Sequence, residues 1–137
     1  MTALTALDDV NYAAVAAAAA LRIPLAGLWH SPLLFGRTWE RMVGLDSAAM
    51  RARPLPVLFG FAFLTSLGGA FVLALLLGPD AGAATGALVG LLAGAGLAGG
   101  AVASSMVFEA RPRPLAAIDA AFHTVLFTAT GAILGVW

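Results

Sequence analysis

The chain has 137 residues, of which 61% are hydrophobic and 10% are charged, and its formal net charge is zero. So few charges cannot form the polar shell of a soluble domain, and the mean hydropathy of +0.97 indicates that lipid is the natural solvent. The composition excludes a disordered tail, a disulfide-stapled domain and a cysteine zinc site, because the chain has no cysteine, and it gives no reason to expect nucleic acid as a partner.

Four apolar segments are long enough to cross about 30 Å of hydrocarbon as helices. They cover residues 11–29, 55–77, 81–107 and 115–136, and proline- or glycine-rich turns separate them. Outer-membrane strands are excluded, because the segments lack an alternating pattern of about ten residues. The sequence therefore predicts an all-α, four-transmembrane-helix bundle that forms a single membrane domain over residues 1–137.

The first span carries a charge and a helix breaker. Arg22 interrupts its apolar stretch, and Pro24 removes one backbone donor, so the Ala20 carbonyl lacks its helical partner. Arg22 lies about 12 Å from the end of the span at His30, on the basis of the helical rise. This places an ionisable group well inside the predicted membrane region.

The loop at residues 30–54 is predicted to form a short interfacial helix after Ser31 and Pro32. A second helical turn is expected after Asp46, a good N-cap residue, and Pro54 ends it. We expect Trp29 and Trp39 to act as anchors at the headgroup level. The proposed apolar face consists of Phe35, Trp39, Met42 and Val43. In one interpretation, the loop arginines set the topology and anchor the loop at the interface. In the alternative, they bind anionic lipid or a partner.

The third span has a stripe of small residues. Gly82, Gly86, Gly90 and Gly94 recur every four residues, and Ala98 continues the row. Helices in lipid associate by close van der Waals approach, which such a stripe permits. The partner is another span of the same chain or a second copy in a homo-oligomer. Small residues that could complement it in the second span are Thr65, Ser66, Gly68 and Gly69, and a second row in the third span comprises Gly96, Gly100 and Ser104.

Polar residues in the fourth span form the candidate intramembrane site. Asp119 and His123 are one helical turn apart, and Thr130 continues the same stripe. Ionisable groups inside a membrane are costly unless they are paired or hydrated. The site is therefore a proton or ion relay or a cation site, or alternatively a structural strut in which Arg22 pairs with Asp119.

The sequence offers little for catalysis. Glu109, Asp119, His30 and His123 are potential metal ligands, but their spacing matches no metal motif, and no nucleotide or nucleophile motif is present. We therefore expect no catalytic residue, no metal and no cofactor. We also expect an uncharacterised membrane component rather than an enzyme.

The arginine distribution predicts the orientation. All seven basic residues are arginines, and six lie in the loops between spans one and two and between spans three and four. Short loops rich in arginine stay in the cytoplasm. We therefore expect a multi-pass protein of a bacterial inner membrane, with both termini outside. The acidic residues without basic neighbours lie on the other side, at Asp8, Asp9 and Asp80.

Two blocks carry a resemblance to a known family. Residues 11–39 run from Asn11-Tyr12 through an alanine-rich stretch to a block with Trp29, Ser31-Pro32, Phe35-Gly36 and Trp39, and residues 108–137 contain the Asp119 to His123 segment. The chain resembles the bacterial membrane family called domain of unknown function 1761 over nearly its whole length. Within this resemblance, His30 stands where Tyr is more usual, and Arg22 is a departure. The resemblance implies a small integral membrane protein without an assigned activity.

Two functions are compatible with these observations. One is a transporter, channel or carrier component with a polar path at Asp119 and His123. The alternative is a non-transporting scaffold or partner-binding subunit in which these residues are structural. The bilayer is the expected partner in both cases.

Overall fold

The structure is a computed structural model that describes residues 3–137. Its longer helices form four spans, each long and apolar enough to cross a membrane. The protein is therefore an all-α, multi-pass membrane protein. The first span consists of α2 (Tyr12–Ala20) and α3 (Arg22–Trp29), and the second is α6 (Leu55–Leu77). The third consists of α7 (Ala83–Leu92), the π-helix η1 (Ala93–Gly99) and α8 (Gly100–Phe108), and the fourth is α9 (Arg113–Val136). The short helices are α1 (Ala3–Asp8), α4 (Gly36–Val43) and α5 (Ser47–Arg51).

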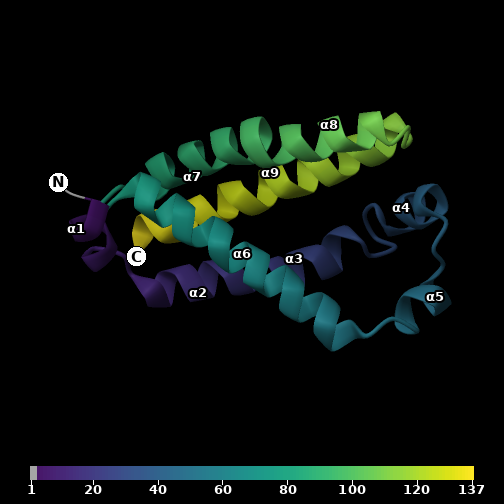
Figure 1. The fold of residues 1–137 in the computed structure, drawn as a ribbon, viewed down its shortest axis with the longest axis horizontal. Helices are drawn as coiled ribbons and strands as arrows, with labels where there is room; N and C mark the ends of the chain where they lie inside the picture. Colours follow the sequence, from purple (N-terminus) through teal and green to yellow (C-terminus); the bar gives the residue numbers. More distant parts are fainter. Residues whose placement is uncertain (1–2) are drawn as a thin grey trace.

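The spans pack as two pairs. In one pair, α9 runs along α7, η1 and α8, and in the other α2 packs on α6 (Figure 1). A core of small side chains joins the pairs, because Val15, Ala18 and Ala19 of α2 meet Ala70 of α6, with Ile133 and Leu134 of α9 packed against them. Towards the other end, α6 diverges from α9, and α3 leads into α4 (Figure 1).

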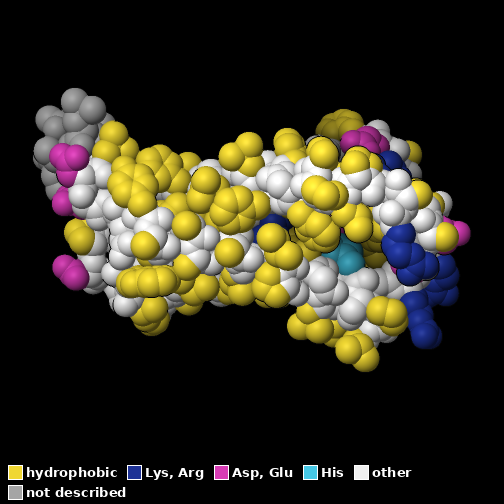
Figure 2. All heavy atoms as spheres, turned by 90° about the horizontal axis from the view of Figure 1, so that it is seen from below, with side chains coloured by type: hydrophobic (Ala, Val, Ile, Leu, Met, Phe, Trp, Pro, Cys, Tyr) yellow, Lys and Arg dark blue, Asp and Glu magenta, His cyan; other side chains and the backbone are white. Residues whose placement is uncertain are grey.

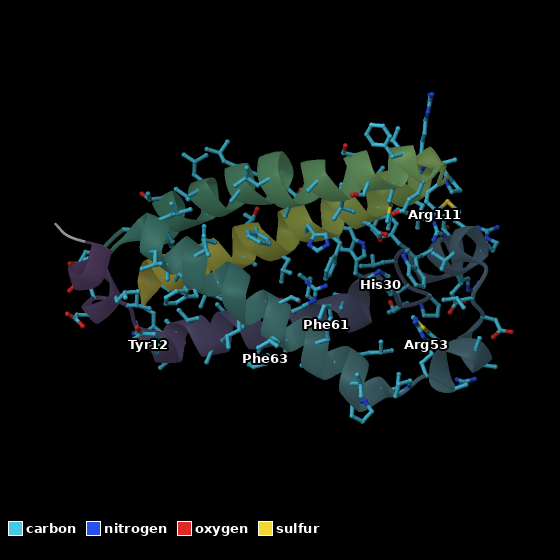
Figure 3. The ribbon with its side chains drawn as sticks, viewed as in Figure 1. Tyr12, His30, Arg53, Phe61, Phe63 and Arg111 are labelled. Atoms are coloured by element: carbon cyan, nitrogen blue, oxygen red, sulfur yellow. The ribbon has the colours of Figure 1, made fainter. Side chains whose placement is uncertain are left out.

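The two ends of the bundle differ in charge. The connection from α3 to α6 and the turn from α8 to α9 share one end, where Arg53, Arg111 and His30 lie (Figure 3). We call it the arginine end, since basic side chains gather there, whereas acidic side chains are seen at both ends (Figure 2). The opposite end, which holds α1 and the α6–α7 turn, is the aspartate end. Its acidic residues are Asp8, Asp9 and Asp80.

The short helices of the loop follow the predicted pattern. Asp46 caps α5, since its carboxylate accepts the Ala49 N–H at 2.7 Å. Gly44 ends α4 in the left-handed conformation, with φ of 75°, which glycine adopts without steric cost. However, α4 begins at Gly36 and not at Ser31, because residues 31–35 form turns.

The first span is interrupted at Leu21, between α2 and α3. Pro24 explains the break, because a proline three residues into a helical segment cannot donate to the carbonyl four residues before it. The backbone ladder resumes with the Leu25 N–H, which donates to the Leu21 carbonyl at 3.1 Å. The span is therefore two short helices in succession, with Arg22 at the joint.

The π-helix in the third span was not predicted, and it changes which residues face α9. Each π turn contains about one residue more than an α turn. The buried row therefore runs through Gly86, Gly90 and Gly94 and continues at Gly99, five residues later. The expectation that Ala98 continues the row is wrong for this reason. Of the second expected row, Gly96 is exposed and would accommodate a Cβ in open space.

Candidate functional site

A tight turn at the end of α3 positions the site. Ser31 Oγ donates to the Leu28 carbonyl at 2.7 Å, and the Gly36 N–H donates to the Ser31 carbonyl at 2.9 Å. Gly36 is buried, and a Cβ built on it would overlap the carbonyl oxygen of His30. The turn thus requires glycine at this position, and it folds α4 back so that Trp39 lies beside His30.

Asp119 of α9 is the polar centre of the site. Its Oδ1 accepts a hydrogen bond from Trp39 Nε1 at 3.2 Å and lies 4.0 Å from His30 Nε2. The carboxylate side chain is 17% exposed and the histidine is 31% exposed, so both are only partly shielded. His30, Trp39 and Asp119, which we call the His–Trp–Asp cluster, join the first span, α4 and the fourth span.

The histidine in this cluster has a defined role for each ring nitrogen. His30 Nδ1 lies 3.0 Å from the Ala26 carbonyl, which is only an acceptor, so we assign the proton of the neutral ring to Nδ1. Nε2 then carries the lone pair that faces Asp119.

An aromatic group surrounds Phe122, which lies about one helical turn after Asp119 on α9 and contacts His30 of the cluster. The Phe122 ring lies 5.9 Å from that of Trp29, 5.6 Å from His30 and 5.4 Å from His123. The Arg22 guanidinium carbon lies 5.5 Å above the same ring, which is a cation–π geometry. Residues from α3 and α9 therefore converge on Phe122.

The residues predicted for the intramembrane site are separated. Asp119 belongs to the His–Trp–Asp cluster, whereas Arg22 and His123 lie at Phe122, and Thr130 is buried further along α9 at 5% exposure. Within the described residues 3–137, the carboxylates that lie within 4.0 Å of a basic side chain are Asp119, beside His30, and Glu109, beside Arg111. Arg22 is therefore not paired with Asp119.

The two tryptophans expected as interface anchors are both half-buried, and their role as anchors stays a prediction. Trp29 contacts Phe35 at 4.8 Å between ring centroids, and its buried Nε1 has no hydrogen-bond partner in the described part of the chain. Trp39 donates its Nε1–H to Asp119. Sequence reasoning missed that His30 and Trp39 meet Asp119, and the signal was present in the two blocks that carry the family resemblance.

The glycine row of the third span lies against α9. A Cβ on Gly86 would overlap the Gly131 carbonyl oxygen, and one on Gly90 would overlap the Phe127 carbonyl oxygen. On α9, a Cβ on Gly135 would overlap the Gly82 carbonyl oxygen, whereas a Cβ on Gly82 itself would meet no atom within 4 Å. The complementary small residues are thus on α9 and not on α6, where a Cβ on Gly68 would contact nothing within 4 Å. A homo-oligomer through this row stays a prediction, and a second copy would have to displace α9.

No group of three or more potential metal ligands occurs among the side chains that the structure describes. Two hollows have defined linings. One, of about 200 Å³, lies at the aspartate end beside Asn11 and Asp80, and an open groove at the arginine end is lined by Arg37, Arg41 and Leu45. Neither of them has the His–Trp–Asp cluster in its lining.

Comparison with known proteins gives a family and no activity. The family described as protein of unknown function, DUF1761, matches residues 13–135, so the chain belongs to this family. The expected resemblance is confirmed. Neither the curated proteins nor the solved structures contain a match to the chain.

Proposed function

We propose that this member of the DUF1761 family is a non-transporting membrane scaffold that holds the arginine-bearing segment of residues 36–53 at the cytoplasmic face of a bacterial inner membrane. The observation that carries the proposal is the hydrogen bond from Trp39 to Asp119, at 3.2 Å. It fixes α4 to α9, and so determines where the segment lies. Lipid or a cytosolic partner then meets the segment.

The orientation follows from the charges. Basic side chains gather at one end of the molecule (Figure 2), and loops rich in arginine remain in the cytoplasm. In this orientation both chain ends lie on the outer side. The groove beside Arg37 and Arg41 would then open to the cytoplasm, where a partner could reach it.

The energetics favour a structural role for Asp119. A carboxylate near the membrane is costly unless it is paired or hydrated. A hydrogen bond to a charged group contributes about 1.5–3 kcal/mol. The hydrogen-bond donor to Asp119 is Trp39 of α4, so the carboxylate and the segment stabilise each other. We expect loss of this bond to raise the open fraction of the segment by about 10- to 150-fold.

Limited proteolysis in liposomes tests the proposal. Asp119→Ala and Trp39→Phe should both speed tryptic cleavage after Arg37, Arg41 and Arg51, because each substitution removes the hydrogen bond between α4 and α9. Glu109→Gln, at a half-exposed surface ion pair, is the matched control and should leave the cleavage rate unchanged. Equal cleavage rates in the wild type and both variants would refute the proposal that this hydrogen bond holds α4 against α9.

A transport or carrier role is the second candidate. The observation in its favour is that Asp119 and His123, one turn apart on α9, are both partly exposed. The two roles differ in their response to substitution. A pH-driven flux into proteoliposomes that Asp119→Asn abolishes and Trp39→Phe preserves would support transport, and an equal absence of flux in all three proteins would support the scaffold.

A further inference from the structure

Arg22 is an ionisable group without a counter-charge inside a spanning segment. It is the first residue of α3, and its side chain is partly buried. Within the described residues no carboxylate lies within 4 Å of it, and Asp119 accepts its hydrogen bond from Trp39 instead. Its contact with the Phe122 ring contributes about 0.5–2 kcal/mol, less than the cost of a charge at the centre of a bilayer.

Arg22 is also too far from either end of its span to reach the headgroups easily. It lies ten residues after Tyr12 and seven before Trp29, which corresponds to about 15 Å and about 10 Å along the helix. Side chains lean toward the N-terminus of their own helix, so Arg22 leans along the longer of the two paths. Its charge must therefore be compensated within the membrane region.

Around Phe122, Arg22 and Trp29 supply N–H donors, and no carboxylate of the described residues lies beside them. The Phe122 ring is shared by the Arg22 guanidinium and the His123 imidazole, at 5.5 and 5.4 Å. The Trp29 indole packs on the same ring, and its buried Nε1–H has no acceptor in the described part of the chain. A group of negatively charged oxygens is the chemical complement of this set.

Access to this region is from the side of the bundle. Viewed from below, a basic side chain is visible within the apolar band of the bundle (Figure 2). On the neighbouring α6, Phe61 and Leu64 are exposed at 69% and 63%. Since α6 diverges from α9 at this end (Figure 1), an acyl chain could lie along α6 while its head reaches inward.

We propose that Arg22, with His123 beside it, binds a carboxylate or phosphate group that enters laterally between α6 and α9. The oxyanion belongs to an acyl-chain amphiphile of the membrane or to a small anion from water. It accepts hydrogen bonds from the guanidinium of Arg22. The site does not depend on the scaffold role of Asp119.

Tryptophan quenching tests this site. The protein, in phosphatidylcholine nanodiscs, is titrated with dibromostearate, whose bromines quench nearby indoles such as Trp29, and with its methyl ester, which lacks the carboxylate. Saturable quenching by the acid at a concentration about tenfold lower than by the ester, corresponding to about 1.4 kcal/mol, is the expected result. Arg22→Gln should abolish this difference, whereas Arg53→Gln, in the exposed loop, should preserve it.

Inorganic phosphate distinguishes the two sources of the oxyanion. Competition by phosphate that is lost in Arg22→Gln would support a small anion, and preference for dibromostearate without competition would support the membrane amphiphile. Equal quenching by the acid and the ester, or an undiminished difference in Arg22→Gln, would overturn the proposal. If Arg22→Gln does not fold, Arg22→Lys keeps the charge but loses the forked donor geometry, and should weaken binding severalfold.

Discussion

Substitution of Gly90 by alanine tests the contact between the third and fourth spans. A Cβ at this position would overlap the Phe127 carbonyl oxygen and would lie 2.8 Å from the carbonyl carbon and 3.0 Å from Thr128 Cα. These are backbone atoms of a long helix, so they cannot rotate away as a side chain can. The third span would have to move away from α9.

The cost can be worked out from this geometry. Carbon atoms attract one another best at about 3.5–4.0 Å, so the helices would separate by about 1 Å. A gap of this size forfeits about a quarter to a half of the attraction of each separated atom pair. Because the neighbouring contacts of Gly86 and Gly94 separate too, we expect about 2–3 kcal/mol of lost stability, at the upper end of the range for overpacking.

The assay is reversible unfolding in mixed micelles with rising dodecyl sulfate, followed by near-ultraviolet circular dichroism. The matched control is Gly96→Ala in the same span, where a Cβ meets no atom within 4 Å. We expect the control to remain within about 0.5 kcal/mol of the wild type. An unchanged midpoint for Gly90→Ala, or an equal loss for Gly96→Ala, would show that these helices do not pack through the glycine row.

Three further predictions concern the loop and the orientation. Gly36→Ala should distort the turn, because its Cβ overlaps the His30 carbonyl oxygen, and so weaken the protection of residues 36–43 from hydrogen exchange. Asp46→Ala removes the 2.7 Å cap of the Ala49 N–H, which should cost about 0.5–2 kcal/mol locally and speed exchange of that amide. Alkaline phosphatase fused after Trp137 should be active, since it works only outside the cytoplasm, and an inactive but stable fusion would reverse the proposed orientation.

The positions of the spans and caps could be predicted from the sequence because they depend on local chemistry. The second span was predicted at residues 55–77, and the structure has α6 at Leu55–Leu77. Proline and glycine fix where such helices begin and end, and hydropathy fixes what lies between. The Asp46 cap was predicted in the same way, because it involves an amide only three residues away.

The sequence did not predict which helix packs against each helix face. The glycine stripe predicted close packing, but Gly68 and Gly131 are equally plausible partners in sequence, and only the tertiary structure selects Gly131 on α9. The π-helix moved the stripe from Ala98 to Gly99, because one extra residue in a turn rotates everything that follows.

The candidate site divides in the same way. The sequence by itself determined that Arg22, Asp119 and His123 are the ionisable groups within the spans, since this depends only on composition and hydropathy. The tertiary structure decided that Asp119 meets Trp39 and His30, while Arg22 remains at Phe122 without a carboxylate. The physical reason is that a turn closed by Gly36 brings residues 80 positions apart within hydrogen-bond distance, which no local pattern encodes.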